Sequence, residues 1–183
     1  MKIFFLRLFF ILSLVFFQFS FFNILFSRVS VPIILIVAVV AWTLIVGFPR
    51  VLYMVIPLSI FFDIASFGAL GALTLYAVPL AYATDFLSRR LLAEHHGMGM
   101  ILYALFASLG SFGYGVFHFV FTRGSSFLWS AETVTRFFRA TGFLELLLPI
   151  FSSVVFFPIL YWSIRRFETY MSFAVQKEIL QMR

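Results

Sequence analysis

Long apolar runs with almost no charged residues dominate this sequence and restrict what the chain can fold into. A helix needs about 20 apolar residues to cross the hydrocarbon core of a bilayer. Six runs near this length are separated by short polar stretches: residues 3–26, 31–46, 51–67, 69–87, 100–121 and 143–164. Because the backbone inside a bilayer must satisfy its own hydrogen bonds, we expect each run to be an α-helix.

Composition excludes most other classes of protein. Only 11% of the 183 residues are charged, whereas soluble domains average about 25%. The 29 Phe residues speak against a disordered chain, and the absence of cysteine removes disulfides and thiolate chemistry. We therefore predict an all-α fold, a polytopic helical bundle forming a single transmembrane domain over residues 1–183.

The basic residues lie at the ends of the apolar runs and predict the orientation of the chain. Six spans place both termini on one side of the membrane. If that side is the cytoplasm, nine of the thirteen basic residues are inside: Lys2, Arg7, Arg50, Arg89, Arg90, Arg165, Arg166, Lys177 and Arg183. The four outside are Arg28, Arg123, Arg136 and Arg139. This positive-inside bias favours cytoplasmic termini.

Several stretches between and after the runs have their own expected places. We expect Gly47-Phe48-Pro49-Arg50 to form the turn between the second and third spans. Residues 122–142 form an amphipathic outer segment that we expect to lie along the membrane surface. Residues 165–183 read as a helical cytoplasmic tail, whose apolar residues fit either the inner leaflet or a partner. The three tryptophans, Trp42, Trp129 and Trp162, are expected to anchor span ends at the interface.

Asp63 is the ionisable residue that most calls for an explanation, because it lies inside an apolar run. It would either make a polar contact within the bundle or with a partner, or cap the next helix near Ser66 and Gly68. Asp85 is spaced for an ordinary ion pair with Arg89. In the six-span arrangement the two carboxyls differ in depth by about 14 Å, which disfavours an aspartyl dyad.

The remaining polar residues give no convincing catalytic or metal-binding pattern. Adjacent residues on a helix point apart, so Glu94-His95-His96 reads as a solvated loop. We expect His118 to be a hydrogen-bonded histidine of the bundle, and the small residues Ser108, Gly110, Gly113 and Gly115 to let another backbone come close. The sequence thus predicts no catalytic residue, no metal and no cofactor.

The segment from Val29 to Arg90 resembles the MreD rod-shape-determining family. The resemblance is carried by the helix beginning near Pro32, by Gly47-Phe48-Pro49-Arg50, and by Asp63 followed by Gly68 and Gly71. A small-residue helix with Ala81-Tyr82, closed by Arg89-Arg90, completes the pattern. The rest of the chain agrees with the family in layout, although its Phe content departs from a more Leu-rich norm.

This resemblance implies a non-enzymatic scaffold of the elongation machinery in a bacterial inner membrane. Such a protein would bind an MreC-like bitopic protein and help link MreB filaments to the synthases that make peptidoglycan. The resemblance carries Arg50, Asp63, Gly68 and Gly71 over as structural or partner-interface residues. It implies membrane lipids as surroundings. Nucleic acid is not expected as a partner, because no basic patch with interleaved aromatic residues stands outside the apolar runs.

Two other functions stay open at this point. The layout and size are also similar to the substrate-binding components of energy-coupling-factor transporters, which bind vitamin-type small molecules. Polar candidates for such a pocket near the outer side are Asp63, His118, Glu132 and Glu145. The bulky Phe and Leu residues of the first span speak against docking of a coupling subunit. An intramembrane enzyme is the third and weakest hypothesis.

Overall fold

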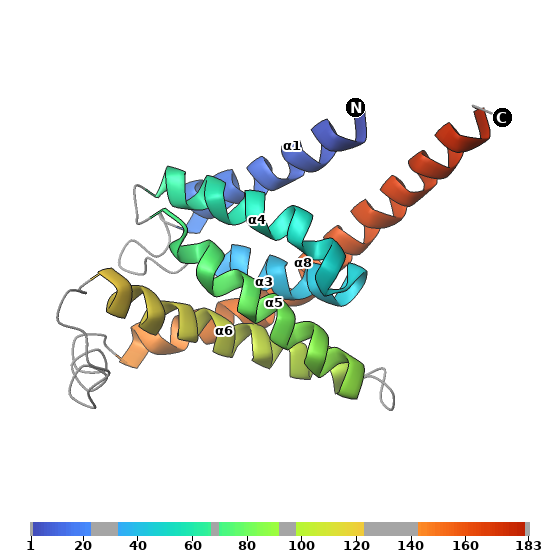
Figure 1. Cartoon of the computed structure of the whole chain (residues 1–183). Helices are drawn as coiled ribbons and strands as arrows, with labels where there is room; N and C mark the ends of the chain where they lie inside the picture. The colour runs from blue at the N-terminus through green and yellow to red at the C-terminus, as the bar shows by residue number, and fades with distance from the viewer. Residues whose placement is uncertain (1, 23–32, 67–69, 92–97, 123–142, 182–183) are drawn as a thin grey trace.

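The computed structural model describes residues 2–22, 33–66, 70–91, 98–122 and 143–181, and within these ranges every regular element is helical (Figure 1). The elements are α1 (Lys2–Phe17), the short π-helix η1 (Gln18–Phe22), α3 (Ile33–Val46), α4 (Phe48–Ala65), α5 (Ala72–Leu91), α6 (Met98–Thr122) and α8 (Phe143–Gln181). The predicted all-α class is therefore confirmed for the described residues. The expected outer segment 122–142 lies, after its first residue, outside them.

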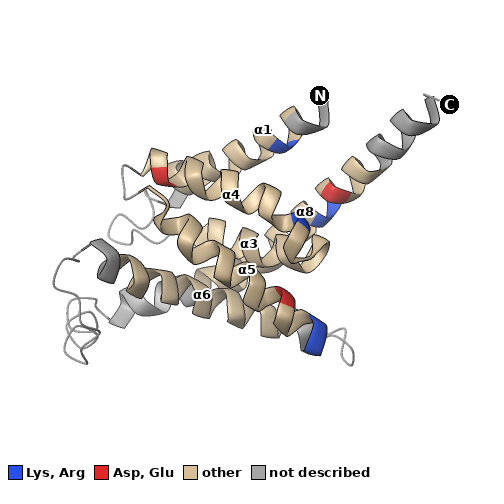
Figure 2. Cartoon of the chain, in the orientation of Figure 1, with Lys and Arg blue, Asp and Glu red and all other residues tan. Residues whose placement is uncertain are grey.

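Successive helices run in alternating directions (Figure 1). The first residues of α1 and α4 and the last residues of α3 and α5 lie at one end of the bundle, which we call the termini end. The final part of α8 also projects from this end (Figure 1). The basic residues of the described chain gather toward the termini end (Figure 2).

Helix α3 forms the centre of the bundle. Its residues are apolar on every face, and the eleven from Ile33 to Thr43 are all buried. It packs against α1, α4, α5, α6 and α8. A helix that is hydrophobic all round is stable only when it is surrounded, and here the other helices surround it. The hydroxyl of Thr43 donates a hydrogen bond to the Val39 carbonyl at 2.7 Å, so its polar atom is satisfied within the helix.

The outer helices are apolar on both their inner and outer faces. Phe9 on α1, for example, is 74% exposed. On four helices the exposed apolar residues recur every three or four positions: Phe5, Phe9, Leu12 and Phe16 in α1, Tyr53, Ile56, Ile60 and Ile64 in α4, Ile101, Leu105 and Leu109 in α6, and Phe151, Val155, Ile159 and Trp162 in α8. Soluble monomers rarely expose apolar surface on this scale.

Two helical segments are long and apolar enough to cross a membrane by length and composition. They are Phe48–Ala65, which is the whole of α4, and Met100–His118 within α6. Phe5–Ser20 and Ile33–Val46 are apolar helical segments of shorter length.

The predicted turn between the second and third spans is shorter in the structure than expected. Gly47 alone breaks the chain, with φ of +80°, and α4 already begins at Phe48. Pro49 fits the first turn of α4, because the N–H it lacks would have no partner within the helix. The predicted start at residue 51 is therefore wrong by three residues.

The last predicted span and the predicted tail form a single helix. α8 continues from Phe143 to Gln181 without interruption, which corresponds to about 58 Å. Its last half contacts α1 and α3 through the side chains of Phe167 and Glu168. The first part of the tail thus packs on the bundle of its own chain, which neither expectation for the tail had included.

Candidate functional site

Polar side chains that are buried or partly buried cap the beginnings of three helices. The first N–H groups of a helix have no partner within it, and inside a bilayer water does not replace that partner. The Gln18 side-chain oxygen accepts a hydrogen bond from the Ile34 N–H at 3.0 Å, at the start of α3. The Asp85 carboxylate accepts a hydrogen bond from the Phe48 N–H at 3.3 Å, at the start of α4. The Asp63 carboxylate accepts one from the Leu73 N–H, at the start of α5.

Asp63 lies near the end of α4 and is only 2% exposed. Its Oδ2 accepts a hydrogen bond from the Gly71 N–H at 2.8 Å, and its Oδ1 accepts one from the Leu73 N–H at 3.3 Å. A carboxylate at this place also interacts favourably with the positive end of the α5 dipole. The capping interpretation of Asp63 agrees with these contacts.

Gly71 gives the chain the conformation that brings its N–H to Asp63. Its φ is +86°, a value that residues with a Cβ rarely adopt. A Cβ added here would meet no atom within 4 Å, so the requirement for glycine is purely conformational. Gly68, the other glycine of the family-like pattern, lies outside the described residues.

Asp85 mirrors Asp63 at the opposite end of the α4–α5 pair. Besides accepting from Phe48 N–H, it forms the predicted ion pair with Arg89, at 2.9 Å. Each of the two antiparallel helices therefore supplies the carboxylate that caps the other. Asp63 contacts Leu73, twelve residues before Asp85 on α5, so about 18 Å of helix separates the carboxylates. This separation agrees with the predicted difference in depth and prevents a shared-proton dyad.

Arg50 lies in the first turn of α4, at the termini end and thirteen residues from Asp63. It lines a pocket of about 300 Å³ together with Arg7, Tyr53 and Glu168. The structure therefore brings Asp63 and Gly71 together but places Arg50 about 20 Å away along α4. Arg50 on one side and Asp63 with Gly71 on the other thus lie at opposite ends of α4 and do not form a single site.

A second polar group lies beside Asp63, between α5 and α6. His118 and Tyr114 are close enough for electrostatic interaction with the Asp63 carboxyl. The rings of Tyr114 and His118 are 5.7 Å apart, and Tyr76 lies 5.4 Å from Tyr114. Two of the four residues proposed for a small-molecule pocket are thus neighbours. Glu132 and the side chain of Glu145 lie outside the described residues.

Two glycines of α6 allow side chains of other helices to come close. A Cβ on Gly113 would stand 2.6 Å from the Tyr76 hydroxyl, closer than real Cβ atoms approach a neighbour. A Cβ on Gly110 would stand 3.2 Å from Leu80 and 3.4 Å from Ile36. The Tyr76 hydroxyl also donates a hydrogen bond to the Gly110 carbonyl at 2.6 Å. The predicted close approach at these two glycines exists, but the groups that approach are side chains and not a second backbone.

The sequence reasoning missed a junction between α1, α3 and α8. Trp42 is fully buried, and its indole N–H donates to Oε1 of Glu168 at 2.8 Å. Arg7 pairs with Oε2 of the same carboxylate at 3.3 Å, and Phe10 stacks on Phe167 at 4.4 Å. The interpretation of Trp42 as an interfacial anchor is therefore wrong.

A signal for this junction was present in the sequence. Phe157, Leu160, Ile164 and Met171 are buried and share one face of α8. Their spacing of three, four and seven residues continues past Arg165-Arg166 without a change of phase. The change in composition at these arginines suggested an end to the packed helix, whereas the apolar period did not.

Among the residues that the structure describes, no group of three His, Asp or Glu side chains could hold a metal ion. Glu94, His95 and His96 lie outside them. Comparisons of the chain with protein-family models, with curated proteins and with solved structures find no match. The likeness to the MreD family therefore rests on the residues quoted for it above.

Proposed function

We propose that this chain is a polytopic protein of a bacterial inner membrane, whose long helices all cross the bilayer, and that it serves as a non-enzymatic scaffold. The apolar outer faces of α1, α4, α6 and α8 support the membrane embedding, because such surfaces are stable against lipid. The gathering of arginines at the termini end supports cytoplasmic termini (Figure 2).

The observation that carries the scaffold proposal is the filled centre of the bundle. The residues from Ile33 to Thr43 of α3 are buried on all sides, so the axis of the bundle is occupied by a helix. A transport path or a large central pocket needs that volume. The polar residues Gln18, Asp63 and Asp85 are engaged with helix ends of the same chain. With the centre filled and these polar residues engaged, we place the function of the protein on its outer surface, as binding of other proteins.

In its specific form, the proposal follows the resemblance to the MreD family. The scaffold binds an MreC-like bitopic protein and helps connect MreB filaments with the peptidoglycan synthases of the elongation machinery. The family-like residues support this role as structural ones, because Arg50 lies in the first turn of α4 while Asp63 and Gly71 join its end to α5.

Photocrosslinking in bacterial cells tests the scaffold proposal. A crosslinking amino acid is placed at one exposed apolar position on each outer face: Phe9, Ile60, Leu75, Leu109 and Ile159. The scaffold predicts that one face captures a single-span protein with a coiled-coil segment. The buried position Val37 is the matched control and should capture only the chain itself. No capture from any face, together with a vitamin found by mass spectrometry in the purified protein, would overturn it.

The alternative of a small-molecule binding subunit has one observation in its favour, the proximity of Asp63 and His118. Against it, both Asp63 oxygens already accept backbone hydrogen bonds from α5. A ligand that bound there would have to break the cap of that helix. The mass spectrometry of the purified chain separates the two functions directly.

A further inference from the structure

A groove between α6 and α8 opens on the outer surface of the bundle. Ile101, Ala104 and Leu105 of α6 form one wall, and Val154 and Pro158 of α8 form the other. Its volume is about 220 Å³, and its lining is formed by apolar residues. A groove of this kind on a lipid-facing surface has the shape and chemistry to hold a hydrocarbon chain.

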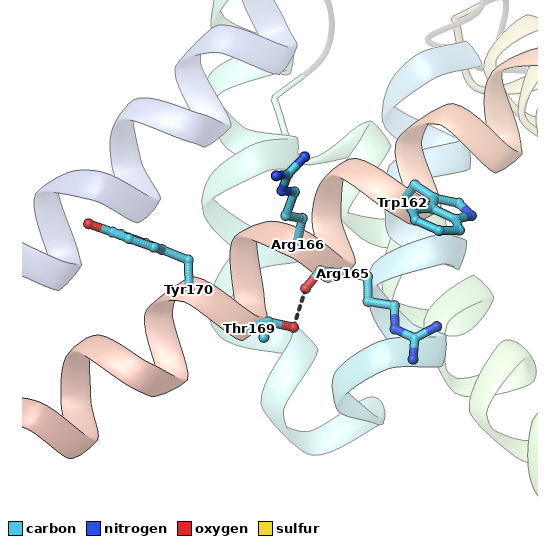
Figure 3. Close-up of a pocket in the computed structure, with 5 residues that line it drawn as sticks. All are labelled: Trp162, Arg165, Arg166, Thr169 and Tyr170. Carbon is cyan, nitrogen blue, oxygen red and sulfur yellow. Dashed lines mark hydrogen bonds between the residues drawn. The ribbon is translucent and has the colours of Figure 1, made fainter.

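The same face of α8 turns polar immediately beyond this groove. Trp162, Arg165 and Thr169 follow Pro158 at four, seven and eleven residues, which places them in one line along the helix. With Arg166 and Tyr170 they line a second pocket of about 580 Å³ (Figure 3). Trp162 and Arg165 project from the same side of α8 (Figure 3).

The two pockets follow each other along α8 as the acyl chain and the charged headgroup follow each other in a phospholipid: the apolar groove comes first and the pocket lined by arginines second. Pro158 and Arg165 are seven residues apart, or about 10 Å along the helix. Because α6 begins at Met98 and runs antiparallel to α8 (Figure 1), the arginines stand beyond its first turn. The apolar groove thus lies between the two ends of the bundle, and the pocket with the arginines lies at the termini end.

The arginines carry charge that the described part of the chain does not neutralise. The ion pairs in that part join Arg7 to Glu168 and Arg89 to Asp85, and Arg165 and Arg166 pair with no carboxylate there. The Thr169 hydroxyl is engaged with the Arg165 carbonyl at 2.8 Å. The Arg165 guanidinium group and the indole of Trp162, which is 70% exposed, project from the same side of α8 and face a ligand there, whereas Arg166 projects from another side of the helix (Figure 3). Guanidinium groups bind phosphate oxygens by paired hydrogen bonds.

From this arrangement we propose that α6 and α8 form a binding site for an anionic glycerophospholipid of the cytoplasmic leaflet. Its phosphate binds Arg165, its glycerol region lies beside Trp162, and one acyl chain occupies the groove of Ala104 and Pro158. The inference rests on the membrane embedding proposed above. It is independent of the identity of any protein partner.

Native mass spectrometry of the full chain, purified in detergent and supplied with defined lipids, tests the site. The unmodified protein should retain phosphatidylglycerol in preference to phosphatidylcholine. The double variant Arg165→Gln/Arg166→Gln should retain about tenfold less phosphatidylglycerol, because two basic residues near a charged lipid are lost. Arg89→Gln/Arg90→Gln is the matched control, since it removes an adjacent arginine pair at the same end of the bundle.

Two outcomes of this experiment overturn the site. Either Arg165→Gln/Arg166→Gln retains phosphatidylglycerol like the unmodified chain, or the control pair lowers retention equally, which would mark a general effect of charge. Inorganic phosphate and glycerol phosphate serve as competitors. If they displace the lipid at concentrations near its own, the headgroup alone is recognised and the acyl-chain groove is refuted.

A second measurement covers the case in which the double variant does not fold. The chain used here carries Trp129→Phe, so that its remaining tryptophans are Trp42 and Trp162. In vesicles of phosphatidylglycerol that carry a quencher near the glycerol, its fluorescence should be quenched. Adding Trp162→Phe should remove most of this quenching, because Trp42 is buried. Equal quenching in both proteins contradicts the site. Reporter fusions that place both termini in the cytoplasm would leave the membrane proposal standing even then.

Discussion

At the scale of single residues, the polar side chains of this protein act mainly on backbone groups. Gln18, Asp63 and Asp85 each accept a hydrogen bond at the beginning of a helix in another segment of the chain. In water such caps contribute about 1 kcal/mol. Inside a bilayer no water is present to replace the capping side chain. The same hydrogen bonds therefore decide whether the start of a helix can lie within the hydrocarbon region.

Replacing Asp63 should therefore destabilise the fold. We expect Asp63→Ala to lower the free energy of unfolding by about 2 kcal/mol, because both α5 N–H groups lose their acceptor. Asp63→Asn keeps one acceptor oxygen and should cost less. Thermal unfolding in detergent measures both, with Ile64→Ala, at an exposed neighbouring position, as the control. An unchanged melting temperature for Asp63→Ala would contradict the capping role.

Gly71 offers a test of backbone conformation alone. Because φ is +86° and a Cβ would meet nothing, Gly71→Ala should cost about 1 kcal/mol through strain and not through a clash. Asn tolerates positive φ better than Ala does, so Gly71→Asn should unfold at a higher temperature than Gly71→Ala. The reverse order would show that contacts, and not φ, require the glycine.

The sequence predicted part of this set of residues. Asp63 was visible because a charge inside an apolar run needs a reason, and the ion pair of Asp85 with Arg89 followed from helical spacing. Gln18 was not visible, since a neutral amide looks like a minor interruption of an apolar run. Its partner, Ile34 N–H, is sixteen residues away, and only the packing of α1 against α3 brings the two together.

At the scale of elements, apolar runs predicted which helices exist, and turn chemistry decided where they end. Each of the six predicted runs overlaps one α-helix of the structure. The start of α4 was misplaced because Pro49 reads as a turn residue, although proline is equally suited to a first helical turn. The last span and the helical tail were predicted as separate segments because the charges at Arg165-Arg166 were given more weight than the uninterrupted apolar period.

The junction of α1, α3 and α8 predicts two different costs at one position. Glu168→Gln keeps an acceptor for the Trp42 indole and loses the ion pair with Arg7, which is partly exposed, so it should cost less than about 1 kcal/mol. Glu168→Ala leaves the buried indole N–H without its partner and should cost about 2 kcal/mol.

Chemical unfolding in detergent, followed by tryptophan fluorescence, measures these costs. Arg7→Gln should match Glu168→Gln, and combining the two should add little further cost, since both remove the same ion pair. Additive effects, or equal costs for Gln and Ala at position 168, would refute this account of the junction.

At the scale of the whole molecule, the alternation of helix directions and the distribution of arginines agree with each other. The first residues of α4 and the last of α5 carry Arg50, Arg89 and Arg90 at the end of the bundle from which both termini project (Figure 2). Sequence alone predicted this grouping from the positive-inside rule. It did not predict that α3 would be the centre, because every run is apolar and hydropathy does not rank them by burial.

The topology of the proposed membrane protein is directly measurable. Reporter fusions at residue 1, at residue 183 and between α5 and α6 should all report the cytoplasmic side. A fusion between α6 and α8 should report the outer side. The control is a chain with Arg50, Arg89 and Arg90 changed to Gln, which should lower the fraction in this orientation. Termini on opposite faces would overturn the six-span arrangement.

The direction of the helix caps along the chain has a consequence for biosynthesis. Gln18 and Asp63 are synthesised before the helices that they cap. The acceptor for the start of α3 and the acceptor for the start of α5 are therefore already present when each helix forms. Phe48 must wait for Asp85, thirty-seven residues later. If the chain is inserted into a membrane as proposed, we expect α4 and α5 to leave the translocon together as a hairpin, because α4 is capped only after Asp85 has been made.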